Sequence, residues 1–171
     1  VDQAPPEGRR YVQVSLGNGY CALDDLGQAT CWASNNGTVL EQPAGTFVQL
    51  VGGSDFRCGL SNTGSLSCWG DSTSGVVEDA PTGVVRHVAA SGGYACSLDA
   101  EGSLSCWGDD TYGQVSEAPS GPFVGIALTG GWGCGRDSLG ELDCWGWGDV
   151  SDTPPAGSFV QASLADWHGC S

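Results

Sequence analysis

Apolar and polar residues alternate along the chain in a way that predicts short strands and no helix. Runs of five or six residues alternate apolar with polar or small side chains, and turns rich in glycine and small polar residues follow them. Short runs of this kind, separated by turn residues about every 8–12 positions, are typical of all-β proteins. No window shows the apolar period of an amphipathic helix. The predicted strands lie within 11–16, 47–51, 85–89, 123–128 and 159–164, with further strands around each cysteine pair.

This pattern repeats with a period near 37 residues. Cysteines occur in pairs ten residues apart, and the first cysteines of successive units are separated by 37, 38, 38 and 36 residues. A fixed period of this length indicates a solenoid or a propeller. We therefore expect four complete units and a half unit after an N-terminal extension. The predicted boundaries are 1–10 for the extension, 11–46, 47–84, 85–122 and 123–158 for units one to four, and 159–171 for the half unit.

A glycine lies six residues after the first cysteine of every pair and predicts how the two cysteines meet. A three-residue hairpin loop that ends in a left-handed glycine places them directly opposite each other on one face, about 4.5–5.5 Å apart at Cα, which suits a disulfide. Zinc is the competing interpretation, but zinc ligands usually lie about two to four residues apart in sequence. The predicted bridges are Cys21–Cys31, Cys58–Cys68, Cys96–Cys106 and Cys134–Cys144.

The density of these bridges predicts a secreted, extracellular protein, because disulfides are rare in the cytosol. Cys170 is left over, since the chain ends before a partner ten residues further on. An odd cysteine in a secreted protein suggests an intermolecular bridge or an unpaired thiol. Three interpretations of the half unit stay open: a fragment of a longer propeller, a shortened chain, or a subunit that the next subunit completes.

Charge and composition exclude two classes of partner. Among 171 residues, 20 Asp and Glu stand against five Arg, and the net charge is −15. An acidic surface repels phosphate backbones, so we expect no nucleic-acid binding. No apolar run approaches the length of about 20 residues that a membrane span needs.

A shared motif surrounds the cysteine pairs and carries a family resemblance. In unit two it reads Phe56-Arg-Cys-Gly-Leu, Gly64 and Cys68-Trp-Gly, and in unit three Tyr94-Ala-Cys-Ser-Leu, Gly102, Cys106-Trp-Gly and Tyr112-Gly-Gln. These units resemble the repeats of the regulator-of-chromosome-condensation superfamily, and the resemblance covers nearly the whole chain from about Tyr11. The paired-cysteine form is similar to bacterial secreted repeat proteins and to plant receptor ectodomains.

The resemblance implies a β-propeller of four-stranded blades, which usually closes with about seven units in this family. Four units and a half therefore imply an array that is open or that another chain completes. The functions that the resemblance implies are diverse: nucleotide exchange with chromatin binding, β-lactamase inhibition, and binding of ligands or protein partners. Fold does not choose among them, and the basic contacts of the chromatin role are missing here.

Candidate catalytic groups are few. The two histidines, His87 and His168, stand in different repeat contexts, and no Ser-His-Asp arrangement is evident. The adjacent carboxylates Asp24-Asp25 and Asp109-Asp110 are better explained by bonds to turn backbone than as a glycosidase pair. We therefore expect no enzymatic activity and no cofactor.

A calcium site is a further alternative. Asp71, Asp109 and Asp149 follow Trp-Gly in three units, and Ca²⁺ takes about six to eight oxygen ligands. No compact Asp-x-Asp-x-Asp ladder is present, so a solvated acidic rim is favoured. An enzyme stays conceivable only where these three carboxylates converge on a metal.

Aromatic residues and one sequon complete the candidates. Trp32, Trp69, Trp107 and Trp145 share one repeat position, which favours packing between units, while Trp147 falls outside it. A second row, just before the first cysteines, either packs or forms a contact surface, because aromatic residues anchor interfaces. This row consists of Tyr20, Phe56, Tyr94, Trp132 and Trp167. Asn36-Gly37-Thr38 is a sequon, which makes Asn36 the candidate glycosylation site.

Two functions follow from these observations. The first is a secreted, non-enzymatic structural protein that assembles head-to-tail, through its half unit, into an extracellular fibre or surface layer. The second is a binding or inhibitory propeller module that presents an aromatic and acidic rim to another protein, as the receptor-ectodomain and β-lactamase-inhibitor resemblance implies.

Overall fold

The computed structural model describes residues 8–33, 44–147, 157–161, 163–165 and 168–170, and this part of the chain consists of strands, turns and loops without a helix. Four sheets have three antiparallel strands each, and a fifth has two. The strands of the first two sheets are β1 (Tyr11–Ser15), β2 (Gly19–Asp24), β3 (Ala29–Ala33), β4 (Gln49–Gly52), β5 (Phe56–Leu60) and β6 (Leu66–Gly70). Those of the other three are β7 (His87–Ser91), β8 (Tyr94–Leu98), β9 (Leu104–Gly108), β10 (Gly125–Leu128), β11 (Trp132–Arg136), β12 (Leu142–Gly146), β13 (Ser163–Ala165) and β14 (His168–Cys170).

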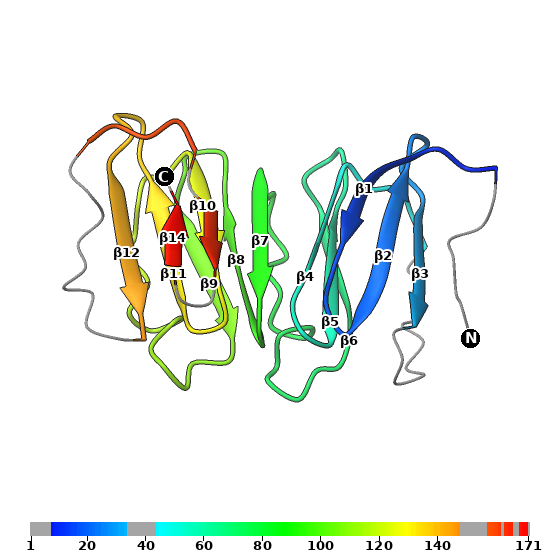
Figure 1. Cartoon of the computed structure of the whole chain (residues 1–171), viewed down its shortest axis with the longest axis horizontal. Coiled ribbons are helices and arrows are strands. Elements are labelled where there is room, and N and C mark those ends of the chain that lie inside the picture. Colours follow the sequence, from blue (N-terminus) through cyan, green and yellow to red (C-terminus); the bar gives the residue numbers. More distant parts are fainter. Residues whose placement is uncertain (1–7, 34–43, 148–156, 162, 166–167, 171) are drawn as a thin grey trace.

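The sheets stand side by side as the blades of an open propeller-like array, which confirms the predicted all-β repeat fold (Figure 1). The first strands of successive sheets, β1, β4, β7 and β10, are neighbours in this order, and β13 lies beside β10. The sheets do not close into a ring, and the β1–β3 and β10–β12 sheets lie towards opposite ends of the array (Figure 1).

Among the described residues each of the first four sheets has three strands, and the second and third units lack the fourth strand that the resemblance implied. The segments 71–86 and 109–124, which separate the second, third and fourth sheets, form turns and loops. Aspartate side chains accept hydrogen bonds from backbone N–H groups of these segments. Asp71 Oδ1 accepts the Thr73 N–H at 2.7 Å, and Asp109 Oδ1 accepts the Thr111 N–H at 3.1 Å. Backbone turns continue from there, so β6 and β9 remain edge strands without a fourth strand beside them.

The hairpins have the register that the cysteine and glycine spacing predicted. The two cysteines of each pair lie directly opposite and are bridged, with Cα atoms 4.0–4.1 Å apart, slightly closer than expected. At the turn of the third hairpin, Gly102 has a φ of +85°, which favours glycine. Asp99 Oδ1 braces the same turn by accepting the N–H groups of Glu101 and Ser103 at 3.0 and 2.8 Å.

Strands β4, β7 and β10 start two residues later than predicted, because the first residues of each unit bind the preceding hairpin instead. The N–H of Phe47 donates to the Gly27 carbonyl at 2.7 Å, and the N–H of Phe123 donates to the Gly102 carbonyl at 2.8 Å. A Cβ on Gly102 would lie 2.5 Å from the Phe123 carbonyl oxygen, so this turn glycine also permits the close approach of the next unit.

The core lies between successive sheets. Leu50 and Trp69 of the second sheet pack on the Cys21–Cys31 disulfide of the first sheet. In the same way, Val88 and Trp107 pack on Cys58. Each disulfide therefore braces its own hairpin, and the first three also form part of the surface on which the next sheet rests.

Candidate binding surface

The repeated tryptophans occupy the junctions between units. Trp107 Nε1 donates to the Val76 carbonyl at 2.8 Å, and Trp145 Nε1 donates to the Gln114 carbonyl at 2.9 Å. Both acceptors lie 31 residues before the tryptophan, in the loop that follows the preceding sheet. Trp69 Nε1 is buried without a partner, and the position 31 residues before it lies outside the described residues. Packing between units, as predicted, is the role of Trp69, Trp107 and Trp145.

The first sheet leaves uncovered a face that is covered in the later units. Val14 is 55% exposed, whereas Leu50 and Val88 at the equivalent position are each 1% exposed. Leu50 and Val88 rest on the disulfide of the preceding sheet, and no described segment covers Val14 in this way. The uncovered face therefore presents Val14, an apolar side chain of the kind that the later units bury between neighbouring sheets.

Aromatic residues extend this uncovered face. Tyr20 is exposed and stacks on Trp32, with ring centroids 5.9 Å apart. Tyr20 has the register position of Arg57 and Ala95, opposite the repeated tryptophan. One position earlier in their units, Phe56 and Tyr94 are fully buried, and the Tyr94 hydroxyl donates to the Trp132 carbonyl at 2.8 Å. Of the row before the first cysteines, Phe56 and Tyr94 pack in the core and Tyr20 is available for contact. Trp167, the last member of the row, lies outside the described residues.

A second aromatic surface lies on the rim between units three and four. Tyr112 and Trp147 are 46% and 57% exposed, and their ring centroids lie 5.2 Å apart in a tilted arrangement. Tyr112 comes from the loop after β9 and Trp147 from the end of β12, so the pair spans two units. We call Tyr112 and Trp147 the rim pair.

Hydrogen bonds hold the loop that carries Tyr112 in one conformation. Gln114 is fully buried, and its Oε1 accepts the Tyr112 N–H at 2.7 Å. Its Nε2 donates to Asp109 Oδ2 at 3.2 Å. Asp110 Oδ1 accepts the N–H groups of Val115 and Ser116, each at 2.9 Å. The Ser116 N–H, as the largest contribution, holds the pKa of Asp110 below its ordinary value.

The candidate calcium ligands are used within their own loops. Asp71 and Asp109 each accept a backbone N–H and a hydroxyl from the threonine two residues later. The Thr73 hydroxyl is the main reason that the pKa of Asp71 is lowered. Asp149 lies outside the described residues, and among those that are described no group of three or more His, Cys, Asp or Glu is arranged to hold a metal ion.

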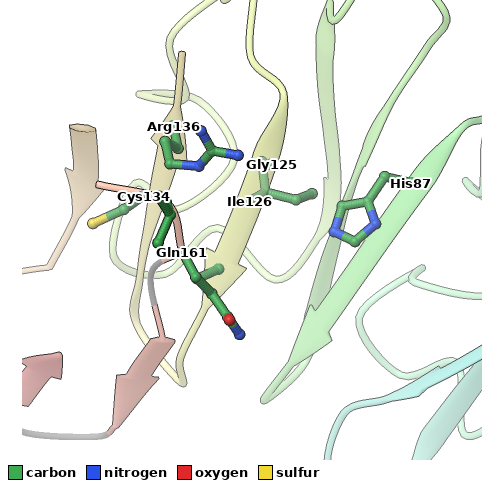
Figure 2. Close-up of a pocket in the computed structure, with 8 residues that line it drawn as sticks. His87, Gly125, Ile126, Cys134, Arg136 and Gln161 are labelled. Carbon is green, nitrogen blue, oxygen red and sulfur yellow. The ribbon is translucent and has the colours of Figure 1, made fainter. Parts of the chain in front are cut away.

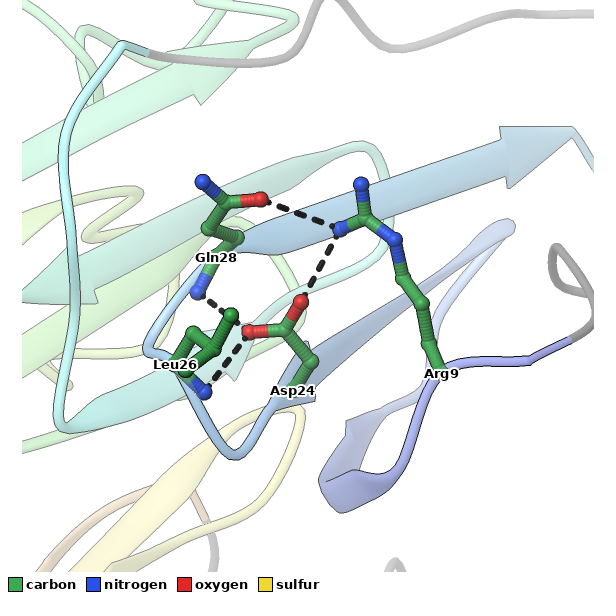
Figure 3. Close-up of polar contacts among 4 residues, drawn as sticks. All are labelled: Arg9, Asp24, Leu26 and Gln28. Atoms are coloured by element: carbon green, nitrogen blue, oxygen red, sulfur yellow. Dashed lines mark hydrogen bonds and ion pairs between the residues drawn. The ribbon is translucent and has the colours of Figure 1, made fainter.

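The carboxylates at Asp24 and Asp25 belong to the first hairpin turn, as predicted. Asp24 Oδ1 accepts the N–H groups of Leu26 and Gln28 at 3.0 and 2.8 Å, and its Oδ2 pairs with Arg9 Nη1 at 2.9 Å (Figure 3). The Gln28 N–H, ahead of the Arg9 charge, holds the pKa of Asp24 below its ordinary value. Arg9 thereby ties the segment before β1 to the molecule's own first sheet.

The remaining sequence candidates are dispersed. His87 begins β7, is half-buried, and hydrogen-bonds the backbone of Ile126; burial lowers its pKa. His168 and Cys170 begin and end β14, and the side chains of both lie outside the described part, as does all of Asn36. Within the described residues, His87 is not grouped with other candidate catalytic residues.

Sequence reasoning missed the side chains that join the first strands of successive sheets. Gln13 Nε2 donates to the Leu50 carbonyl at 2.7 Å, and the Leu50 N–H donates back to Gln13 Oε1 at 2.9 Å. Gln49 Nε2 likewise donates to the Val88 carbonyl at 3.0 Å. Glutamine recurs at the third position of the apolar runs, at Gln13, Gln49 and Gln161, and this recurrence is the sequence signal that could have identified the role.

Sequence comparison agrees with the repeat motif. Residues 85–114 match the model of the regulator of chromosome condensation (RCC1) repeat. No curated protein resembles the chain significantly in sequence. The part of the chain that the structure describes contains no helix of the length and apolarity needed to cross a membrane.

Solved structures resemble the chain in fold. The ectodomain of the receptor kinase CR4 from Physcomitrella patens has a TM-score of 0.77 and 26% identity over 93% of this chain and 46% of that one. The CRINKLY WD40 ectodomain of the Arabidopsis thaliana receptor kinase ACR4 has a TM-score of 0.67 and 23% identity over 81% and 51%.

Prp20p from Saccharomyces cerevisiae, a protein studied for binding to Gsp1p and histones, has a TM-score of 0.69 and 20% identity over 87% of this chain and 48% of that one. The chain thus spans about half the length of the three structures. Its motifs, its sheets and these likenesses lead to one conclusion: the chain is an array of disulfide-braced, RCC1-like β-propeller repeats.

Proposed function

We propose that the chain is a non-enzymatic, extracellular protein-binding propeller module that contacts its partner through the rim pair. The exposure of both Tyr112 and Trp147 carries this proposal. Exposed aromatic residues anchor protein interfaces. The hydrogen bonds of Gln114 fix the loop before binding, which lowers the entropy lost when a partner docks.

The surroundings of the rim pair favour a partner surface with apolar and basic groups. Asp109 and Asp110 lie three and two residues before Tyr112, and the chain has a net charge of −15. Such a field speeds the approach of a positively charged partner and repels an acidic one. The four disulfides favour an oxidising compartment, which supports an extracellular partner.

Affinity capture tests this function. The chain is used to capture proteins from the extracellular medium of its source, beside a double variant, Tyr112→Ala with Trp147→Ala. We expect one stoichiometric partner with the unaltered chain and none with the double variant. Tyr20→Ala removes an exposed aromatic ring far along the array and serves as the matched control, which should still capture the partner. Capture that survives in the double variant overturns the assignment of the rim pair.

Head-to-tail assembly into an extracellular fibre or surface layer is the second candidate, and the uncovered face of the first sheet favours it. Val14 has the side-chain character of Leu50 and Val88, which rest on a disulfide-bearing sheet, and Tyr20 adds an exposed aromatic ring to the same face. The next sheet of the same chain already covers the disulfides of the first three sheets, so the fourth sheet of a second copy is the proposed complementary surface. A contact of this kind joins two different surfaces and continues into a fibre where it does not close.

Light scattering under non-reducing conditions tests this assembly. We expect large particles from the unaltered chain and a smaller species from Val14→Asp, because a charge cannot be buried in this contact without a large cost. Trp147→Ala, which alters only the rim pair, should leave the particle size unchanged. A monodisperse monomer of the unaltered chain contradicts the assembly.

We also propose two modification sites at residues whose side chains the structure does not describe. Asn36 is the proposed glycosylation site, and Cys170 is the proposed intermolecular cysteine. The intact mass of the native protein, measured before and after reduction and enzymatic deglycosylation, tests both. An unchanged mass after deglycosylation contradicts the first, and a monomer mass before reduction contradicts the second.

A further inference from the structure

Side chains at the third position of each apolar run bridge neighbouring first strands, and this series stops at the fourth unit. Gln13 binds the backbone of Leu50, Gln49 binds that of Val88, and His87 binds that of Ile126. The equivalent residue of the fourth unit is Gly125, which has no side chain with which to continue the series.

A pocket of about 260 Å³ lies where this side chain is missing. Ile126, Ala127 and Val160 supply apolar wall, and three polar side chains, those of His87, Arg136 and Gln161, also line the pocket (Figure 2). None of the lining residues is acidic. A Cβ built on Gly125 has no neighbour closer than Arg136 Nη2, at 4.0 Å, so the space beside this glycine is open.

Arg136 is the second departure of the fourth unit from the repeat. The equivalent residues are Leu23, Leu60 and Leu98, all buried, and Arg136 keeps the same register opposite Leu142. In Figure 2 its guanidinium extends towards the side of the pocket where Gly125 lies. The two departures therefore occur at one place: one opens the pocket, and the other lines it with a positive charge.

The guanidinium of Arg136 is poorly satisfied by the protein. Only Nη1 has acceptors among the described residues, the carbonyls of Asp137 and Phe159 at the long distances of 3.4 and 3.5 Å. The ion pair found within the described residues joins Arg9 to Asp24, not Arg136 to any acid. The chain has 20 acidic residues and five arginines, yet none of the described acids pairs with Arg136. Its donors in the pocket are therefore available to an anion from outside the chain.

We infer that this pocket binds a carboxylate through Arg136. A guanidinium presents paired N–H donors that match the two oxygens of a carboxylate. Gln161 adds a further N–H donor at the pocket wall, and His87, which hydrogen-bonds the Ile126 backbone, adds a polar ring. A pocket smaller than the roughly 300–1,000 Å³ typical of drug-sized ligands suits a short aliphatic acid or a single acidic side chain of a partner. The apolar residues receive its hydrocarbon part.

This site is separate from the rim pair and from the uncovered face of the first sheet. Carboxylate binding is therefore tested independently of the proposed function. The test follows the backbone amides and the Arg136 Nε–H signal of the whole ¹⁵N-labelled chain by NMR during titration. The probes are succinate, its uncharged analogue succinamide, inorganic phosphate, and the blocked tripeptide Gly-Glu-Gly with its Gly-Gln-Gly counterpart. Saturable shifts of Gly125, Ile126 and Arg136 with succinate or with Gly-Glu-Gly, and not with the uncharged analogues, are expected.

Two variants restore the repeat residues and keep the test independent of folding. Arg136→Leu supplies the leucine of the other units, and Gly125→Gln supplies their glutamine and fills the pocket. Both should unfold at the same denaturant concentration as the unaltered chain or a higher one, and should weaken carboxylate binding by about tenfold or more. Arg10→Leu removes the same charge from an exposed position and should leave the affinity unchanged.

The outcomes separate the sources of the ligand. Binding of succinate alone indicates a small acid, and binding of Gly-Glu-Gly alone indicates an acidic side chain of a protein. Absence of saturable shifts with both acids overturns the inference. So do equal binding of the uncharged analogues, undiminished affinity in Arg136→Leu, and tighter binding of phosphate than of either carboxylate.

Discussion

A buried arginine joins the first two sheets without an acidic partner in direct contact. Arg57 is fully buried, and its Nη1 donates to the carbonyls of Gly53 and Phe56 at 3.0 and 2.5 Å. Its Nη2 donates across the junction to the carbonyl of Gly19 in β2. A side chain on Gly17 would collide with this guanidinium, so the glycine makes room for it. Burial lowers the pKa of Arg57, and the nearby charge of Asp55 opposes this effect.

Replacing Arg57 by methionine tests how much these bonds contribute. Arg57→Met keeps roughly the length of the side chain but removes the guanidinium donor from three carbonyls, those of Gly53, Phe56 and Gly19. Hydrogen bonds to charged groups contribute about 1.5–3 kcal/mol, and we expect a loss of this order in the free energy of unfolding. Chemical denaturation measures it. Arg86→Met, at an exposed position, should change stability by less than about 0.5 kcal/mol. Equal stability of both variants contradicts the role of Arg57.

The turn carboxylates predict that acid weakens the fold. The pKa of Asp24 is below its ordinary value of 3.8, mainly because of the Gln28 N–H, and those of Asp71 and Asp110 are lowered as well. The unfolded chain therefore binds protons more readily, so the stabilisation is present above pH 3.8 and is lost as the pH falls below it. Denaturation midpoints at about pH 6 and pH 3 measure the loss. Asp24→Asn should show a smaller difference between the two values, and an equal difference argues against a contribution from Asp24.

At the scale of the element, the hairpin around each cysteine pair is the best-determined piece of the molecule. The disulfide, the left-handed glycine and the capping side chain each specify the same strand register. In the second hairpin, Ser61 replaces aspartate as the cap, and its Oγ accepts the N–H groups of Thr63 and Ser65 at 3.3 and 3.0 Å. The segments 71–86 and 109–124 have no such combination of determinants, and they form loops where the family resemblance implied a further strand.

Removing one disulfide should weaken the array measurably. The double variant Cys58→Ala with Cys68→Ala opens a loop of about ten residues, which costs roughly 2–3 kcal/mol in the chain-entropy model. It also removes sulfur atoms on which Val88 and Trp107 rest. The midpoint of thermal unfolding should therefore fall. Thr63→Ala, in the exposed turn of the same hairpin, is the control and should have a much smaller effect.

At the scale of the whole molecule, stability is a sum over sheets and the contacts between neighbours. Repeat proteins follow this rule because each unit touches only the units next to it. The core of this chain is divided accordingly into three clusters at successive junctions. The fold therefore has no single centre whose loss unfolds all sheets at once.

Leu50→Ala should detach the first sheet while leaving the third intact. Leu50 is buried against the Cys21–Cys31 disulfide, and a Leu→Ala change in a core costs about 2–5 kcal/mol. Hydrogen exchange should show faster exchange in β1–β3 and unchanged protection in β8 and β9. Leu139→Ala, at an exposed turn position, should leave both regions unchanged. Equal loss of protection in all sheets contradicts the nearest-neighbour description.

The local pairing was predictable because its determinants lie close together in sequence. Cys58, Gly64 and Cys68 lie within one hairpin, and the side-chain period of two residues then defines which residues share a face. The same reasoning placed Trp69 at a junction. The candidate contact surface was harder to predict from the sequence, because Tyr112 and Trp147 of the rim pair come from two different units.

The amino-acid sequence by itself determined the repeat, the hairpins and the disulfide pairs, because these depend on short-range geometry and on strict spacing. Only the tertiary structure decided which faces are covered. It buried Arg57 between two sheets, left Val14 uncovered, and placed Gly125 beside Arg136 at one pocket. Burial and charge compensation depend on residues brought together from different strands and units, and a local pattern carries no information about those neighbours.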